Sequence, residues 1–227
     1  VIRSGLLMQP VFEQARKDPR RVVYAEGEDE RVLRACQNIV DEKLARPILI
    51  GRPDVVQHRI DRMGLRLKID RDLELVNPSD DPRYREYWEL YYSIMERKGV
   101  SPDAARTIMR TNATAIAAIM VKRGAMVCGT YGQYSWHLRY LTDVIGLAEG
   151  VTTAAALSAL IVERGIFFIC DTYITHEPSA EEIAETTKLS AEQIKRFGIT
   201  PKVALLSHSS FGTSDAASAL RMRDARL

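Results

Sequence analysis

The sequence predicts an α/β protein with a largely parallel sheet covered by helices on both faces, a three-layer α/β/α arrangement. Short apolar runs alternate along the chain with longer stretches in which apolar residues recur at helical spacing. Most of these runs lack period-two alternation of apolar and polar residues, which is typical of strands buried on both faces. Strands that alternate with helices in this way favour parallel pairing through helical crossovers.

Composition limits the possible functions. The chain has 227 residues, enough for one large domain or two small ones. Its 32 basic and 30 acidic residues are well mixed, which argues against a nucleic-acid surface, since such a surface needs a basic face. No apolar run is long enough to span a membrane, and the first ten residues are poorly patterned for a signal peptide. Cys36, Cys128 and Cys170 lie in apolar stretches and predict reduced core residues of a cytoplasmic protein.

The first part of the chain predicts three strands and five helices. Acidic residues in the turn Glu26–Arg31 suit the positive end of the helix that follows them. Pro53 and Pro102 stand where a helix tolerates proline, in its first turn, and Ser101 is a good N-cap. The aromatic residues of the long helix have the spacing of a packing face. The expected elements are strands over 21–25, 47–51 and 73–77 and helices over 32–44, 53–63, 81–98, from 102, and 111–122.

The second part predicts a hairpin and further strand–helix pairs. The segment 163–165 is a plausible hairpin turn between two apolar strands. Ser179 and Glu182 match a capping box, which predicts the start of a helix. The expected elements are strands over 125–128, 159–162, 166–170 and 202–206 and helices over 138–145, 179–197 and after 215.

Three polar turns follow predicted strands, at Glu26–Arg31, Gly129–Arg139 and Ser207–Asp215. In the second turn, glycines would let backbone amides approach an anion, and Arg139 would add a planar fork of donors. An ordinary strand–helix turn with a surface arginine is the alternative, because the spacing is neither a P-loop nor a dinucleotide fingerprint. Ligands of open α/β sheets bind outside the carboxyl ends of strands, so convergence of the three turns would favour an anion site.

Several motifs carry a family resemblance over most of the chain. The matching runs are Glu26–Leu33, Ala45–Gly51, Gly129–Arg139, Ile169–Asp171 and Lys202–Gly212, and they resemble the phosphotransacetylase family. A narrower set, Asn77–Trp88, Arg110–Asn112, Trp136–Arg139 and Ser207–Gly212, looks like the phosphotransacetylase-like domain at the C-terminus of bacterial NADP-dependent malic enzymes.

The resemblance implies a two-lobed fold with a cleft, like that of isocitrate and isopropylmalate dehydrogenases. The expected lobes are 1–124 and 125–227, the second incomplete at its C-terminus, where the family carries a catalytic Ser-Arg pair and an acid. The implied ligand residues are Arg31, Gly129, Thr130, Tyr131, His137, Arg139, Ser207, Ser209, Ser210, Gly212 and Thr213. Alternatives remain for some of them: His137 and His208 could be packed structural groups, Arg31 could pair with Glu28, and Asp171 could contact ligand.

The resemblance further implies a domain that binds acetyl-CoA, or a related CoA thioester, and regulates a malate-decarboxylating module of the same polypeptide. Members of the family that are active carry an arginine where this chain has Met95, while the second phosphate-binding arginine persists as Arg139. Bulky Tyr134, Trp136 and His137 replace small residues before that arginine. We therefore expect a non-catalytic domain with acetyl-CoA as effector, no cofactor of its own and no metal. It should form a homodimer or higher oligomer and contact neither nucleic acid nor membrane.

Two other functions stay open. One is an active phosphate acetyltransferase, which Met95 disfavours because methionine cannot hold a phosphate. The other is an oligomerisation module, since the helices over 81–98 and 111–121 could form an interface as well as a core.

Overall fold

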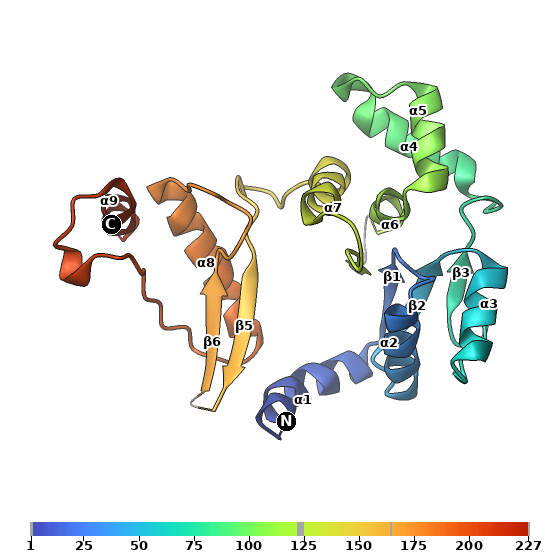
Figure 1. Ribbon diagram of the computed structural model, residues 1–227, viewed down its shortest axis with the longest axis horizontal. Helices are drawn as coiled ribbons and strands as arrows, with labels where there is room; N and C mark the ends of the chain where they lie inside the picture. Colours follow the sequence, from blue (N-terminus) through green and yellow to red (C-terminus); the bar gives the residue numbers. More distant parts are fainter. Residues whose placement is uncertain (1, 122–124, 164, 227) are drawn as a thin grey trace. The chain divides into compact units, whose positions relative to one another are not determined.

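A computed structural model of the chain describes residues 2–121, 125–163 and 165–226 (Figure 1). Two compact units are present: a larger unit of residues 12–146, and a smaller unit of residues 1–11 with 147–227. Helix α1 (Ile2–Lys17) contributes to both units. Gly124, the predicted end of the first lobe, and Arg164, in the predicted hairpin turn, lie outside the described residues.

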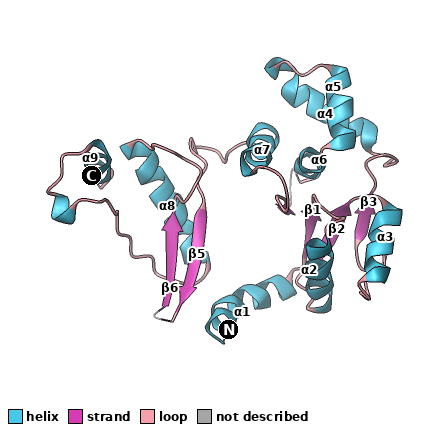
Figure 2. Cartoon of the chain, in the orientation of Figure 1, coloured by secondary structure: helices cyan, strands magenta, loops and turns pink. Residues whose placement is uncertain are grey.

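The larger unit contains a parallel sheet of four strands in the order β3-β2-β1-β4. Figure 2 shows its strands among the helices of this unit. Its elements are β1 (Arg20–Tyr24), α2 (Glu30–Asp41), β2 (Ala45–Ile50), α3 (Pro53–Arg62), β3 (Glu74–Val76), α4 (Tyr84–Met95), a 3₁₀ turn η1 (Glu96–Lys98), α5 (Pro102–Thr111), α6 (Ala113–Met120), β4 (Ala125–Val127), α7 (Tyr134–Tyr140) and a π-helical turn η2 (Leu141–Ile145).

Side chains of the strands alternate between two apolar cores. Val23 and Ile48 join the core formed with α4, α5 and α6, which also buries Tyr91 and Ile116. The neighbouring residues of the same strands point the other way, into the core formed with α2 and α3 and including Leu33. A sheet whose successive side chains enter opposite cores is covered on both faces. The predicted three-layer α/β fold with a mostly parallel sheet is confirmed.

Local capping explains where the helices of this unit begin. The Asp29 side chain accepts a hydrogen bond from the backbone N–H of Arg31 at the start of α2. Ser101 accepts from Ala104 N at the start of α5, and Asn112 accepts from Ala115 N at the start of α6. Short polar side chains at these positions satisfy backbone donors that have no partner inside the helix. The predicted elements before residue 122 accordingly appear close to their expected bounds.

The smaller unit is built differently from the larger one. Strands β5 (Leu157–Val162) and β6 (Gly165–Cys170) form an antiparallel pair, followed by α8 (Ala180–Arg196), a 3₁₀ turn η3 (Ser210–Gly212) and α9 (Ala217–Asp224). The capping box of Ser179 and Glu182 is formed as the sequence predicts. The rings of Phe168 and Phe197 lie 5.8 Å apart between centroids, which packs the end of α8 against β6.

Four expectations are corrected by the structure. The segment 202–206 is not a strand: within the described chain it has no ladder partner, and an apolar run without one does not form a sheet. The helix expected from Leu138 begins at Tyr134. Residues 125–146, expected in the second lobe, belong to the larger unit because β4 pairs with β1. Cys36 is a core residue, but Cys170 is exposed and accepts a hydrogen bond from Ser190.

Within the described part of the chain, no helix combines the length and apolar character needed to cross a bilayer.

The core beneath α2 generates the first prediction. Leu33 has no exposed surface, so Leu33→Ala should leave a cavity and lower the free energy of unfolding by about 2–5 kcal/mol. Urea denaturation followed by circular dichroism measures this change. Ile145→Ala is the control, since Ile145 is 47% exposed and its truncation should cost much less. Equal losses for the two variants would contradict the assignment of the core.

Candidate functional site

The candidate site lies at the carboxyl edge of the parallel sheet. The chain runs outward from β1 to β2 and β3, then returns to place β4 on the other side of β1. The order of strands therefore reverses between β1 and β4, and ligands of such sheets bind in the crevice at that point. Two of the predicted turns, Glu26–Arg31 and Gly129–Arg139, leave these two strands.

Glu26 joins the two turns. Its side chain is almost fully buried, and its Oε1 accepts a hydrogen bond from the Gly129 backbone N–H at 3.0 Å. The same oxygen lies 4.0 Å from Nδ1 of His137. A buried carboxylate needs such partners because it has lost its hydration. The turn after β4 is thereby held against the end of β1, and the Gly129 amide, expected to face an anion, is already bonded to a carboxylate.

His137 links the same turn to two helices. Its Nε2 lies 2.8 Å from the carbonyl oxygen of Tyr131, and its Nδ1 lies 2.8 Å from Oγ1 of buried Thr114 on α6. A carbonyl only accepts, so Nε2 carries a proton, and in the neutral ring Nδ1 accepts the Thr114 hydroxyl proton. The structure thus supports the structural reading of His137, whose ring also borders the cleft.

Gly132 allows this close approach. Its φ of +91° falls in the left-handed region, and a Cβ built there would come within 3.2 Å of His137 Nε2. The backbone conformation therefore favours glycine at this position, and a Cβ would also crowd the His137 ring.

Arg31 braces the two turns from the solvent side. Its Nη2 donates to Asp29 Oδ2 at 2.7 Å and to the Thr130 carbonyl oxygen at 2.7 Å. The alternative that Arg31 pairs with Glu28 is wrong, because Glu28 accepts two hydrogen bonds of 2.9 Å from the Arg52 guanidinium. The hydrogen bond from Arg31 lowers the pKa of Asp29 to about 2, and that from Arg52 holds the pKa of Glu28 below its usual range.

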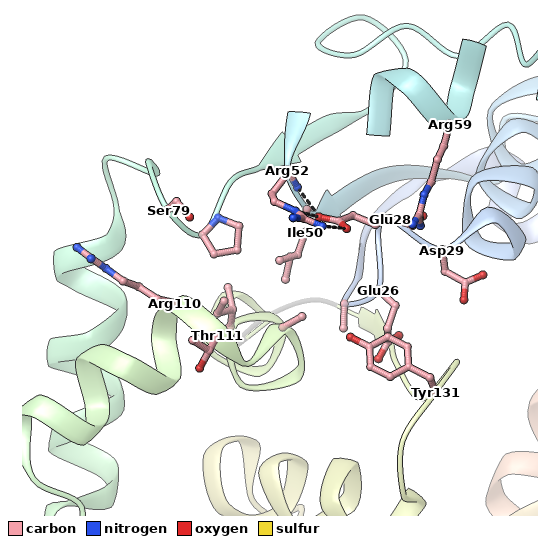
Figure 3. A pocket seen from close by; sticks show the side chains of 15 residues that line it. Glu26, Glu28, Asp29, Ile50, Arg52, Arg59, Ser79, Arg110, Thr111 and Tyr131 are labelled. Atoms are coloured by element: carbon pink, nitrogen blue, oxygen red, sulfur yellow. Dashed lines mark hydrogen bonds and ion pairs between the residues drawn. The ribbon is translucent and has the colours of Figure 1, made fainter. Parts of the chain in front are cut away.

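Two cavities open beside the Glu26–Gly129 contact. The first, of about 450 Å³, lies between the turns that follow β1, β2 and β3 and the junction of α5 and α6. Figure 3 shows Arg52 bonded to Glu28 in this cavity, with Tyr131 on another side of it. Arg110 also borders the cavity, but its guanidinium lies over the Tyr84 ring, 4.5 Å from the ring centroid. The second cavity, of about 580 Å³, lies between α4, α5, α6 and α7. Glu26, Thr111, Ala113 and Tyr131 border both cavities.

Arg139 borders the second cavity together with Met95. The Arg139 side chain is 81% exposed, and its Nε lies 3.5 Å from Asp143 Oδ2, a loose pair. Asp143 makes a closer pair with Lys98, at 2.6 Å. Met95 is only 5% exposed and packs into the core beneath the cavity. Because α7 begins at Tyr134, Arg139 projects from the helix itself and not from the glycine turn that precedes it.

The third predicted turn belongs to the smaller unit and is closed by its own hydrogen bonds. Ser207 Oγ accepts from Ser209 N, and Ser210 O accepts from both the backbone and the hydroxyl of Thr213. Arg223 of α9 donates to the carbonyl oxygen of Gly212, which has a φ of +74°. The expectation that this turn meets the other two stays a prediction.

Asp171, for which ligand contact was an alternative, anchors backbone in the smaller unit. Its carboxylate accepts from the amides of Ala156 at 3.0 Å and Thr175 at 2.8 Å. Burial would raise the pKa of this carboxyl group, but the backbone hydrogen bonds outweigh burial and lower it.

The sequence reasoning missed the roles of Glu26 and Thr114. An acidic residue directly after a buried strand was a usable signal for Glu26, because it places a carboxylate where burial forces it to find donors. Nothing local marked Thr114. Among the described residues, no group of three or more His, Cys, Asp or Glu side chains is placed to hold a metal ion.

Comparison with known proteins adds three findings. The family described as "Phosphate acetyl/butaryl transferase" matches residues 6–226. Over 99% of its length the chain is 54% identical to an NAD-dependent malic enzyme of Rhizobium meliloti (strain 1021) and 51% identical to an NADP-dependent malic enzyme of Escherichia coli (strain K12). It spans 30% of the length of each of these relatives.

The fold is similar to that of a solved phosphotransacetylase from Streptococcus pyogenes. The TM-score is 0.88 at 26% sequence identity, with 99% of this chain and 68% of that chain covered.

The Asp29–Arg31 pair generates a pH prediction. The pKa of Asp29 is about 2 in the folded chain, against about 3.9 for an unperturbed aspartate, so the pair stabilises the fold above pH 4. This stabilisation should disappear as the pH falls from 4 to 2. Asp29→Asn keeps an acceptor for the helix cap but loses the charge, and should flatten the dependence of unfolding free energy on pH in that window.

Urea denaturation at several pH values tests this expectation. Asp103→Asn is the matched control, because Asp103 is also paired with an arginine in the first turn of a helix but is 91% exposed. Identical pH dependence for the unaltered chain and Asp29→Asn would contradict the role given to the pair.

Proposed function

The chain belongs to the Phosphate acetyl/butaryl transferase family, and on that premise we propose that it is an acetyl-CoA-binding regulatory domain of a malic enzyme. In this proposal a separate module of the same cytoplasmic polypeptide decarboxylates malate oxidatively to pyruvate. The malic enzymes similar to this chain carry both NAD and NADP names, so the proposal leaves the nicotinamide coenzyme open.

One observation carries the proposal: Met95 and Arg139 border the same cavity. By the family resemblance, an active transferase has an arginine at each of these positions to hold the phosphate. Here one of the two is a buried thioether, which offers no hydrogen-bond donor. The cavity lies where the strand order of the sheet reverses, but it is bordered by only one of the two arginines that would hold the phosphate.

Arg139 is suited to binding the charged part of a CoA thioester. Its guanidinium is mostly exposed and held only loosely by Asp143, so it can turn toward a phosphate group without breaking a tight ion pair. A hydrogen bond between a guanidinium and a phosphate is stronger than one between neutral groups. The retained arginine therefore supports binding, while the lost one removes the means to hold a second, phosphate substrate.

Regulation requires more than binding. Acetyl-CoA can change the activity of the malate-decarboxylating module only if it binds one global state of the polypeptide more tightly than another. We extend the proposal to a homodimer or higher oligomer, in which such states could differ by the packing of subunits.

An active phosphate acetyltransferase is the second candidate. The retained cleft and the similarity to the phosphotransacetylase of Streptococcus pyogenes favour it. The two functions differ in turnover, because only the transferase would form acetyl phosphate from acetyl-CoA and phosphate.

We predict that Arg139→Ala weakens acetyl-CoA binding by about ten- to a hundredfold, since a charge-assisted hydrogen bond contributes about 1.5–3 kcal/mol. Isothermal titration calorimetry on the full polypeptide measures this change. Arg85→Ala is the matched control: Arg85 is 83% exposed on α4 and pairs with Glu89 four residues on, as Arg139 does with Asp143. Unchanged affinity in Arg139→Ala would contradict the proposal that Arg139 binds acetyl-CoA.

We also predict no acetyl phosphate formation above the uncatalysed background when the protein is mixed with acetyl-CoA and phosphate, because Met95 cannot hold the phosphate. A coupled assay that detects released CoA thiol checks this outcome. Clear turnover would replace the regulatory proposal with the transferase.

A further inference from the structure

Two cations share one carboxylate at the second cavity. Asp143 Oδ1 lies 2.6 Å from Lys98 Nζ, and Asp143 Oδ2 lies 3.5 Å from Arg139 Nε. Arg139 and Asp143 border the cavity, whereas Lys98 reaches Asp143 from the 3₁₀ turn η1 between α4 and α5. The three side chains formally carry one excess positive charge, so the group as a whole attracts an anion.

The backbone around this group is held in place on both sides. Val144, next to Asp143, packs against the core formed with α4, α5 and α6. Gly99 ends the turn after Lys98 with a φ of +87°, and its backbone N–H donates to the Glu96 carbonyl oxygen. An exchange of partners within the group can therefore take place by rotation of side chains alone.

The charge of Asp143 opposes an anion in the cavity. Burial above all, with smaller contributions from Tyr140 and Asp143, raises the pKa of the Tyr91 phenol to about 12, while Arg139 opposes this rise. Tyr91 borders the same cavity. A carboxylate that disfavours a negative charge on Tyr91 also disfavours a ligand anion beside it. Arg139 has to outweigh this repulsion.

Asp143 would also compete with a ligand for Arg139. The Asp143 side chain is only 20% exposed, and a carboxylate with little hydration needs a cation or hydrogen-bond donors. Arg139 stands four residues earlier in the chain, and a guanidinium can hold a carboxylate at two points. The closer pair with Lys98 satisfies Asp143 instead and leaves the Arg139 side chain 81% exposed.

We propose that Lys98 and Asp143 set the affinity of Arg139 for anions: Lys98 holds the Asp143 carboxylate, and the Arg139 guanidinium thereby stays available to a phosphate group. Lys98 acts through Asp143, so it is a positioning residue and does not contact the ligand. The inference rests on the proposed function, in which the phosphate group belongs to acetyl-CoA.

The expected changes in affinity are modest because ion pairs at exposed sites are weak. Lys98→Gln frees Asp143 to close on Arg139 and should weaken acetyl-CoA binding about threefold. Asp143→Asn removes the competing charge and should strengthen binding by about the same factor. Lys98→Arg keeps a cation for Asp143 and should restore the affinity of the unaltered chain.

A double-mutant cycle separates the role of Lys98 from a direct contact. Isothermal titration calorimetry with acetyl-CoA compares the full polypeptide with Lys98→Gln, Asp143→Asn and the double variant at one ionic strength. Lys98→Gln should weaken binding in the unaltered chain and have no effect in the Asp143→Asn background. Arg97→Gln is the matched control, because it removes one positive charge from the same exposed turn and leaves the Lys98–Asp143 pair intact. It should leave the affinity unchanged.

Several results would overturn the inference. Equal weakening by Lys98→Gln in both backgrounds would mean that Lys98 acts on the ligand itself, and no change in Lys98→Gln would mean that it does not act at all. Thermal unfolding shows whether each variant folds. If Asp143→Asn does not, Lys98→Arg decides, since weakening equal to that of Lys98→Gln would also overturn the inference. Each of these results leaves the proposed function standing, whereas no acetyl-CoA binding by the unaltered polypeptide would overturn both.

Discussion

The cleft depends on one buried carboxylate. Glu26 directly follows Ala25 at the end of β1, where the sheet reverses its strand order, and it is almost fully buried. Its partners come from the turn and helix that follow β4: the Gly129 amide and the His137 ring. Because a buried charge without partners is costly, the turn after β4 must lie over the end of β1. The shared border of the two cavities follows from that contact, since Glu26 and Tyr131 belong to both.

Ion pairing determines which arginine side chains of the cleft are free to turn toward a ligand. Arg31 and Arg52 form two-point contacts with Asp29 and Glu28, and Arg59 donates to the Glu28 carbonyl oxygen. These guanidiniums brace the turns after β1 and β2, and turning them toward a ligand would break strong hydrogen bonds. Arg139 differs because its nearest carboxylate is already closely paired with Lys98. The motif Glu26–Arg31 thus contributes geometry to the cleft, while in the proposed function the charge for a ligand comes from Arg139 of α7.

The sequence predicted features that depend on residues close together in the chain, and it did not predict contacts between residues far apart in the chain. The caps at Ser101 and Ser179 and the burial of the strands are local, so residue type and spacing were sufficient to predict them. Partners such as Thr114 for His137 depend on how α6 packs against α7, which no short pattern encodes. The prediction of a strand over 202–206 was wrong for the same reason. Its apolar residues suit a strand, but a strand also needs a neighbouring strand to pair with. The turn Gly129–Arg139 already marked Arg139 as a possible anion ligand, whereas only the resemblance to a known family joined Met95 to it.

The contacts that hold the cleft together are different from the contact that phosphate transfer would need. A transferase could therefore lose its activity and keep its cleft, which is what the proposed regulatory domain requires. The hydrogen bonds of Glu26, His137 and Thr114 are satisfied within the protein and need no substrate to form. Position 95 also borders the second cavity, on α4, where its side chain packs with Tyr91 in the core. A methionine there adds apolar contacts to that core, whereas an arginine would have to keep its charge solvated or paired. Under the proposed function, methionine at position 95 would therefore remove a phosphate contact without removing support for the fold, and the cleft would persist without turnover.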